Sequence, residues 1–348
     1  MKKTVLGIAV CLLFVTLAGC GSKKGDNFPT WTEDAAAIQA LESYVETVTD
    51  EKSEDFIPVE DRIAAFDLDG TLYGETFPIY GEWLMFAERA LNDPTYDAPE
   101  DIREVAETVV AAGESRSIPD GLEEAEIKAQ AKAFAGMSIE DYTAYVEQFM
   151  ETDAEGFDNL KRGDAFYLPM LEIVTYLQEN DFMVYICSGT NRFTVRALID
   201  GTLDIPERQV IGTDFTMTAT GQGETGDMHY NITAEDEVLM GDELIIKNVK
   251  TSKVFQIMQE LGKNRSWYSA TAPEISQWHF FPIRKTRTRR KFSSFFAMIQ
   301  SGSTGMRKRR TRFVMPVGNT DGIRFPCGMT GLQFMGMRLV LLSKKERV

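Results

Sequence analysis

The sequence predicts an α/β fold with a mostly parallel sheet, interrupted by a helical insert. Two short apolar runs, residues 62–68 and 182–187, each lead into a turn that contains glycine, as buried strands do. Between them, residues 76–163 are rich in Ala, Glu and Met, and their apolar positions recur at helical spacing. Strands that alternate with helices around such an insert are typical of a mostly parallel sheet.

Further segments extend this pattern along the chain. Four segments have apolar residues at helical spacing and predict helices: residues 35–48, 125–134, 139–150 and 168–179. Another helix follows the second strand, to about residue 199. Residues 209–220 and 228–233 predict an antiparallel pair of strands. Residues 249–261 predict an amphipathic helix that ends at Gly262, a suitable C-terminal cap.

The N-terminus predicts export and a lipid anchor. Lys2 and Lys3 precede an apolar run at residues 5–17, which is too short to span a bilayer comfortably and is typical of an export signal. Small residues then precede Cys20 in the sequence LAGC, which resembles the lipobox of bacterial lipoproteins. This resemblance implies a signal peptide at residues 1–19 and a lipid on Cys20, which holds the protein outside the cytoplasm on the bacterial membrane. An ordinary secretory signal with an incidental cysteine is the alternative.

The composition directs attention to carboxylates. The chain has 2 histidines and 4 cysteines, which argues against a His-based catalytic triad and against a His/Cys zinc site. The cysteines show no pairing pattern, so an exported protein of this kind depends on its core instead of disulfides. The apolar fraction of 43% is sufficient for such a core.

Two acids mark the end of the first predicted strand, in the sequence FDLDGTL. Asp67 and Asp69 are two positions apart, so they point the same way from an extended segment. Ligands bind at the carboxyl ends of strands in open α/β sheets. Neighbouring carboxylates repel unless a cation compensates them, and Mg²⁺ prefers such oxygen ligands. A carboxylate on Mg²⁺ can also attack phosphorus to form an aspartyl-phosphate.

Two further motifs favour a phosphorylated ligand. Ser188 and Gly189 follow the second predicted strand, where a hydroxyl and backbone N–H groups at a helix N-terminus would bind a phosphoryl oxygen. Lys250 begins the last predicted helix, where the helix dipole disfavours a cation, so it indicates an anionic partner. Taken singly, the first motif is also typical of a helix cap and the second of a solvated lysine.

Together and in this order, the motifs resemble the haloacid dehalogenase superfamily, most nearly its phosphoserine-phosphatase-like branch. The resemblance covers roughly residues 56–263. It implies a Rossmann-like core at residues 56–75 and 164–263, with residues 76–163 as a helical cap. Residues 20–55 precede this core as a tether and a helix.

The resemblance also implies a role for each site residue. Asp67 would be the nucleophile and a Mg²⁺ ligand. Asp69 would protonate the leaving group and then activate water, and its backbone carbonyl would bind Mg²⁺. Ser188 and Gly189 would bind the phosphoryl group, and Lys250 would neutralise the charge of the Asp67 nucleophile and of the transferred phosphoryl group.

The implied activity is Mg²⁺-dependent hydrolysis of a small phosphorylated metabolite through an aspartyl-phosphate. Lys247 is a weaker candidate for the lysine of this site. Dehalogenase or phosphotransferase chemistry stays open, because the nucleophile alone does not separate these reactions. The other alternative is a catalytically inactive lipoprotein that binds a phosphorylated ligand or an anionic surface. The acid pair argues against it, since binding alone does not require two such acids.

The tail departs from the family pattern. The family requires a strand and an acidic loop roughly twenty residues beyond Lys250, and neither is recognisable there. Residues 1–263 hold 20 basic and 50 acidic residues, whereas residues 264–348 hold 17 basic and 3 acidic ones. If the codons for residues 265–275 are read in the frame two bases along, they permit the sequence VLVFGNSTGD. That sequence is an apolar strand that ends in a Gly-rich acidic loop, as the family requires.

We therefore interpret residues 264–348 as out of frame and poorly ordered. The enzyme would then be impaired, because the acidic part of its metal site is missing. A genuine basic tail that binds anionic lipid or nucleic acid is the alternative, although we expect no nucleic-acid partner.

Overall fold

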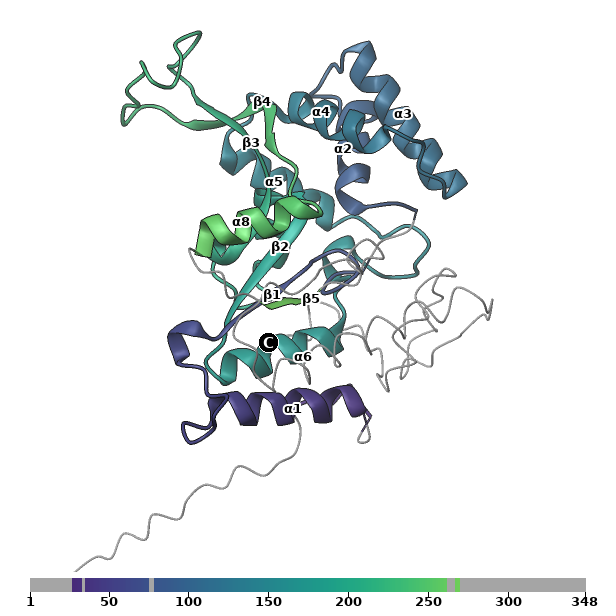
Figure 1. Ribbon diagram of the computed structural model, residues 1–348. Helices are drawn as coiled ribbons and strands as arrows, with labels where there is room; N and C mark the ends of the chain where they lie inside the picture. The colour runs from purple at the N-terminus through teal and green to yellow at the C-terminus, as the bar shows by residue number, and fades with distance from the viewer. Residues whose placement is uncertain (1–26, 33–34, 75–77, 262–266, 270–348) are drawn as a thin grey trace, which may run out of the picture.

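The computed structural model describes residues 27–32, 35–74, 78–261 and 267–269 (Figure 1). The signal peptide, Cys20 and nearly all of the basic tail lie outside these residues, so their interpretation stays a prediction. No helix in the described part of the chain is both long and apolar enough to cross a membrane.

Five strands form one sheet in the order β4-β3-β2-β1-β5. Their bounds are β1 Ile63–Phe66, β2 Met183–Asn191, β3 Val210–Ala219, β4 Val238–Ile246 and β5 Trp267–Ser269. β1 pairs in parallel with β2 and β5, and β2 pairs in parallel with β3; the β3–β4 pair is antiparallel. The predicted α/β class with a mostly parallel sheet is therefore confirmed.

The helices divide between the core and the insert. Their bounds are α1 Ala36–Thr49, α2 Gly81–Leu91, α3 Glu100–Ser115, α4 Leu122–Phe134, α5 Ile139–Met150, α6 Leu168–Glu179, α7 Arg192–Ile199 and α8 Thr251–Leu261, with short 3-10 turns at Val59–Asp61, Arg162–Asp164 and Glu207–Gln209. Helices α2 to α5 come between β1 and β2 in the chain, as the predicted helical insert requires. They gather beyond one end of the strands, whereas α1 and α6 lie toward the other (Figure 1).

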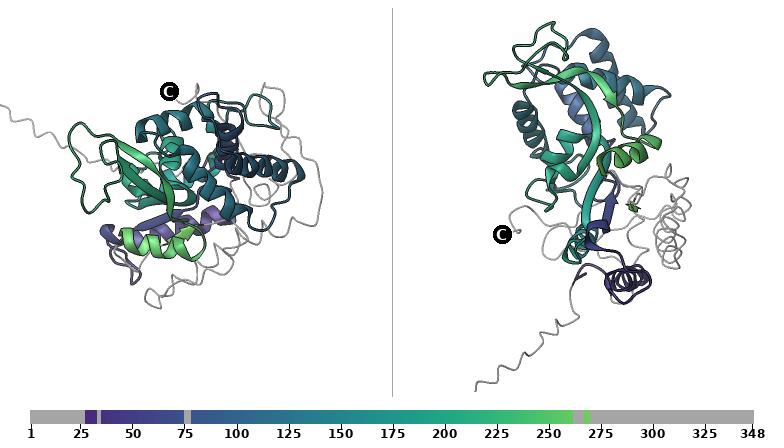
Figure 2. Two further views of the ribbon diagram at one scale, coloured as in Figure 1. Left: turned by 90° about the horizontal axis from the view of Figure 1, so that it is seen from above. Right: turned by 60° about the vertical axis from the view of Figure 1, so that its left-hand side comes forward.

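The two faces of the sheet pack on different helices, because successive side chains of a strand point to opposite faces. Phe66 and Ile186 belong to the main core, which includes residues of α1 and α6. Ala65 and Cys187 instead meet Ile257 of α8, which lies alongside the strands (Figure 2). By the same alternation, the residue after Phe66 falls on the α8 face.

The insert is joined to the core through β4 and α7. Helix α4 packs on β4, and α5 packs on α7. The backbone N–H of Gly136 donates to the carbonyl of Met240, and the N–H of Met240 donates to the carbonyl of Met137, both at 2.8 Å. These backbone bonds fix the insert relative to the carboxyl end of the sheet.

Two predicted strand boundaries are wrong. The strand that pairs with β3 is β4, Val238–Ile246, and not residues 228–233. Those residues lie in the exposed connection between the strands, where Met228 is 91% exposed, so they have no core to pack against. β2 also runs on through Ser188 and Gly189 to Asn191, with a register shift against β3 after Cys187.

A short strand is present in the tail, where we expected none in this reading frame. β5 pairs in parallel with β1, with Ser269 beside Phe66. The strand before the expected acidic loop was predicted roughly twenty residues beyond Lys250, close to β5. The residues after Ser269, where that loop would lie, are outside the described residues.

Candidate active site at the carboxyl end of β1

A tight turn after β1 carries both acids of the site, Asp67 and Asp69. The backbone N–H groups of residues 71–73 all donate to the carbonyl of Leu68, at 2.9 to 3.0 Å. Gly70 has φ of 71°, in the left-handed region that glycine adopts without strain. The turn therefore holds the two acids close together at the carboxyl end of β1.

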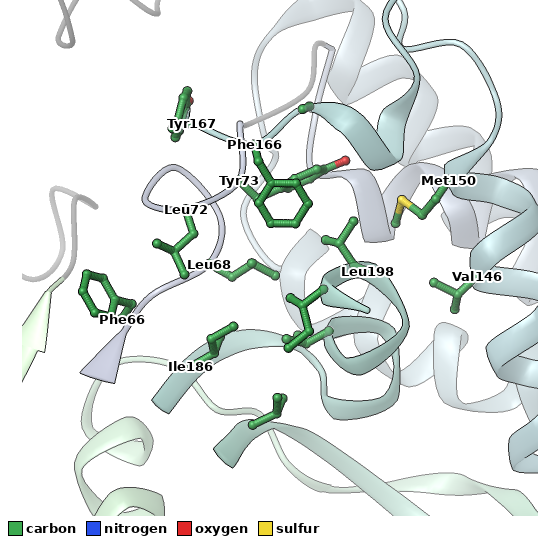
Figure 3. Close-up of a cluster of buried hydrophobic side chains, with 14 of the residues drawn as sticks. Phe66, Leu68, Leu72, Tyr73, Val146, Met150, Phe166, Tyr167, Ile186 and Leu198 are labelled. Atoms are coloured by element: carbon green, nitrogen blue, oxygen red, sulfur yellow. The ribbon is translucent and has the colours of Figure 1, made fainter. Parts of the chain in front are cut away.

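Apolar side chains anchor this turn in the core. Leu68 and Leu72 are fully buried, and Figure 3 shows them in one apolar cluster with Ile186 of β2. The Tyr73 hydroxyl donates to the carbonyl of Arg162 at 2.7 Å, and its ring lies edge-on to Phe166. The polar residues of FDLDGTL are thus held in place by the apolar residues between and after them.

Asp67 is paired with a lysine from α8. The Lys253 Nζ lies 2.7 Å from Asp67 Oδ2, and the two side chains are only 9% and 11% exposed. The backbone N–H of Leu68 donates to Asp67 Oδ1 at 2.9 Å. Because Asp67 falls on the α8 face of the sheet, a cation from α8 meets it there.

The prediction that Lys250 is this cation is wrong. Lys250 is exposed, has a left-handed φ of 50° and precedes α8. The buried face of α8 instead passes through Lys253 and Ile257, and no ion pair between Lys250 and Asp67 occurs among the described residues. The helical spacing of Lys253 with Ile257 and Leu261 was the signal that could have identified it.

Asp69 is held by hydroxyl groups of β2. Thr190 Oγ1 donates to Asp69 Oδ2 at 2.8 Å, and Ser188 Oγ lies 3.4 Å from the same oxygen. Burial raises the pKa of Asp69, and the charge of Asp67 raises it further; Thr190, Lys253 and Lys247 oppose this shift. The sequence did not indicate a role for Thr190, because the motif suggested only Ser188 and Gly189.

The segment that contains Ser188 and Gly189 is braced by a buried network. Asn248 Nδ2 donates to the carbonyl of Ser188 at 2.8 Å, and Thr213 Oγ1 donates to the carbonyl of Gly189 at 2.6 Å. A Cβ at Gly189 would lie 2.9 Å from Val249 Cγ1, so a larger residue would displace this neighbour. The network fixes Ser188 next to Asp69, and phosphate binding by Ser188 stays a prediction.

The acid pair fits part of a magnesium site. Asp67 and Asp69 supply the oxygen ligands that Mg²⁺ prefers, and a divalent cation would offset both the burial and the repulsion that raise the pKa of Asp69. Within the described part of the chain, however, no group of three or more His, Cys, Asp or Glu side chains could hold a metal ion. A third acidic ligand is thus absent from the described residues.

A second group of polar side chains is buried between the insert and the core. Glu82 of α2 accepts the backbone N–H of Asn191 at 2.7 Å, with Thr194 Oγ1 at 3.4 Å. Glu126 and Gln130, on one face of α4, are 0% and 1% exposed. Among the described residues, neither carboxylate oxygen of Glu126 has a hydrogen-bond partner.

Electrostatics connect this group to Asp69. Burial raises the pKa of Glu82 and raises that of Glu126 well above the ordinary value. Lys247, which follows β4, opposes the shift at Glu82, Glu126 and Asp69, so its ammonium lies within electrostatic reach of all three. The sequence did not suggest this group, because the acids come from separate helices.

Comparisons with known proteins give structural neighbours of low identity and low TM-score. No protein-family model and no curated protein matches the chain. A conserved functionally unknown protein from Anaerococcus prevotii DSM 20548 is 12% identical with a TM-score of 0.44, over 81% of this chain and 93% of that one. A protein with unknown function from Bordetella pertussis Tohama I is 18% identical with a TM-score of 0.35, over 57% of this chain and 73% of that one. Cytosolic 5'-nucleotidase IIIB bound to cytidine is 12% identical with a TM-score of 0.35, over 63% of this chain and 62% of that one.

Replacing Lys253 by Met should destabilise the protein by about 3 kcal/mol, because Asp67 would be left nearly buried without its counter-ion. Lys250→Met, at an exposed position, should change the free energy of unfolding by less than about 0.5 kcal/mol. Urea denaturation of both variants at pH 7 measures the difference. Equal effects of the two substitutions would contradict the ion pair.

Replacing Glu126 by Gln should stabilise the protein increasingly as the pH rises. The pKa of Glu126 is raised on folding, so its carboxyl favours the folded state fully only below its ordinary pKa of 4.5. Above that value the wild type should lose about 1.4 kcal/mol per pH unit relative to Glu126→Gln, until the folded carboxyl ionises. Urea denaturation at pH 5, 6 and 7 tests this, with exposed Glu123→Gln on the same helix as control. A difference that does not change with pH would contradict it.

Proposed function

We propose that this protein hydrolyses phosphomonoesters with Mg²⁺ through an aspartyl-phosphate. The observation that carries the proposal is the environment of the acid pair. Asp67 faces the ammonium of Lys253, whereas Asp69, two residues on, faces the hydroxyls of Thr190 and Ser188. One acid is thus next to a cation that compensates phosphoryl charge, and the other is next to proton donors and acceptors.

The place of β1 in the sheet supports this proposal. The chain passes from β1 outward through β2, β3 and β4, and then returns to β5 on the other side of β1. In open parallel sheets such a reversal leaves a crevice at the carboxyl ends of the strands, where ligands bind. Asp67 and Asp69 directly follow β1, at the carboxyl end of this strand.

The residues divide the reaction between them. Asp67 attacks phosphorus, and Lys253 offsets the charge of the carboxylate and of the phosphoryl group. Asp69 donates a proton to the leaving oxygen and then accepts one from the water that hydrolyses the aspartyl-phosphate. Ser188 donates a hydrogen bond to a phosphoryl oxygen, while the Thr190 hydroxyl holds Asp69 in position. When bound, Mg²⁺ would be held by the Asp67 carboxylate and the Asp69 carbonyl and would supply further charge compensation.

A second candidate function is binding of a phosphorylated ligand without turnover. The incomplete metal site favours this candidate, because the described residues provide no third acidic ligand for Mg²⁺. The ion pair and the hydroxyls would then still bind a phosphoryl group, but the reaction would lack part of its charge compensation.

Replacing Asp67 by Asn should reduce the release of phosphate from p-nitrophenyl phosphate by at least about a thousandfold, because the nucleophile is lost. The assay uses the full chain with MgCl₂, and EDTA should also abolish the activity. Lys250→Met, at an exposed position that forms no ion pair with Asp67 among the described residues, serves as control. Undiminished activity of the Asp67→Asn variant would reject the mechanism. Orthovanadate binding without any turnover by the wild type would favour the second candidate.

We also propose that the protein is exported and anchored to the membrane through a lipid on Cys20. The proposal is supported by the lipobox-like sequence LAGC after a short apolar run. The wild type should therefore partition into the detergent phase of Triton X-114, and Cys20→Ala should remain in the aqueous phase. Cys327→Ala is the matched control. Identical partitioning of Cys20→Ala and wild type would exclude this anchor.

A further inference from the structure

A carboxylate of the insert is bonded directly to the strand segment that carries the site. Glu82 of α2 is only 6% exposed, and its Oε1 accepts the backbone N–H of Asn191 at 2.7 Å. The hydroxyl of Thr194 lies 3.4 Å from the same oxygen. Asn191 ends β2 and caps α7, so the bond joins a helix of the insert to the point where the core passes from strand to helix.

Glu82 supplies a contact that α7 lacks within its own sequence. In a capping box, the third residue of a helix is Glu or Gln and accepts the N–H of the capping residue, whose side chain accepts an N–H of the first turn. Asn191 makes the second of these bonds, with its Oδ1 accepting the N–H of Phe193 at 2.8 Å. The third residue of α7 is Thr194 instead of Glu or Gln. The insert therefore completes the cap of a core helix.

The strand ladder does not by itself fix the residues just before Asn191. Residues 188–190 of β2 lie opposite Gly212 alone, between the pairs that Cys187 and Asn191 make with β3. A bulge of this kind leaves residues unpaired and changes the direction of their side chains. Hydrogen bonds from outside the ladder therefore decide where these side chains point.

One of these side chains holds the acid that transfers the proton in the proposed reaction. Thr190 Oγ1 donates to Asp69 Oδ2 at 2.8 Å. The N–H that Glu82 accepts belongs to the peptide group between Thr190 and Asn191. Because a peptide group is planar, a bond to this N–H restricts the backbone of Thr190 and with it the place of the hydroxyl. Glu82 is thus linked to Asp69 through two hydrogen bonds and the backbone of Thr190.

This link exists only while the insert is docked on the core. Tyr142 of α5 shares a hydrogen bond of 2.8 Å with Thr194, so a second helix of the insert meets the start of α7. Movement of the insert away from the core would leave the Asn191 N–H without its acceptor. A buried N–H without an acceptor destabilises a fold, so the docked arrangement is favoured.

We propose that Glu82 is a positioning residue for proton transfer, which holds Thr190, and through it Asp69, in place. As the P–O bond to the leaving group breaks, its electron pair passes to the leaving oxygen, which takes the proton of the Asp69 carboxyl. This step therefore depends on a docked insert. The inference rests on the proposed function, because that function assigns the proton to Asp69.

The test compares two substrates whose leaving groups differ in their need for a proton. The nitro group spreads the charge of p-nitrophenolate, so phenolate depends more on protonation as it leaves. We measure kcat/KM on the full chain with MgCl₂, because this constant covers the steps through departure of the leaving group. Glu82→Met should lower kcat/KM for phenyl phosphate by about a hundredfold, the cost of displacing a catalytic group by about 1 Å. For p-nitrophenyl phosphate the loss should be at least about tenfold smaller.

Three further variants accompany this measurement. Glu82→Gln should stay within about threefold of the wild type for both substrates, because its amide oxygen still accepts the Asn191 N–H. Glu88→Met, an exposed change on the same helix, should leave both constants unchanged. Glu82→Asp keeps the charge but is one methylene shorter, so it should show the selective loss and provides the measurement if Glu82→Met does not fold. Urea unfolding curves establish which variants are folded.

A double-mutant cycle tests the path from Glu82 to Asp69. Thr190→Val should itself show the selective loss for phenyl phosphate. Adding Glu82→Met to Thr190→Val should then change kcat/KM by less than about threefold, because residues that act through one another are not additive. Additive effects would overturn the inference.

The other outcomes separate this inference from the proposed function. Equal losses for the two substrates in a folded Glu82→Met or Glu82→Asp variant would overturn the inference, because a purely structural residue affects both alike. A loss in Glu82→Gln as large as in Glu82→Met would also overturn it, because the hydrogen-bond acceptor would then not be what matters. No release of phosphate from either substrate by the wild type would instead reject the proposed function, and the inference with it.

Discussion

The ion pair between Asp67 and Lys253 is the interaction on which the arrangement of the site depends. It joins the first strand to the last described helix, and both side chains are nearly excluded from water. Charges in such surroundings interact strongly and tolerate little displacement. The same helix face that carries Lys253 carries Ile257 into the sheet, whereas Phe255 points outward and is 55% exposed. Charge pairing and apolar packing therefore specify one orientation of α8.

The turn after β1 shows how the fold brings like charges together. Its apolar residues are fully buried, so Asp67 and Asp69 do not move apart without exposing Leu68 or Leu72 to water. Burial raises the pKa of Asp69, and the repulsion from Asp67 adds to this shift. Thr190 offsets part of it by donating a hydrogen bond. A site of this kind is prepared for a ligand or cation that completes the compensation.

The insert also contains buried acids whose charge needs compensation, farther from β1. Glu126 is buried without a partner on a helix that packs against β4, so it destabilises the folded state unless something else binds it. Glu82 is satisfied by the N-terminus of α7, which places a carboxylate of the insert on the segment that follows Thr190. The charge of Lys247 lowers the pKa of Asp69 in the core and of Glu82 and Glu126 in the insert. The core and the insert are in this way coupled through charge as well as through packing.

The sequence by itself determined the fold class, most helices and the two acids. Their signals are local: an apolar run, a helical period, and two acids in the turn that follows β1. It did not determine Lys253, Thr190 or Asn248, nor the strand β4, because their roles depend on the faces that distant segments present to each other. Lys250 and Lys253 are both lysines close to the start of α8, and only the packing of that helix on the sheet decides which one reaches Asp67. Lys250 precedes the helix in a left-handed conformation and is exposed, whereas Lys253 lies one helical turn before Ile257 on the face that packs on the sheet.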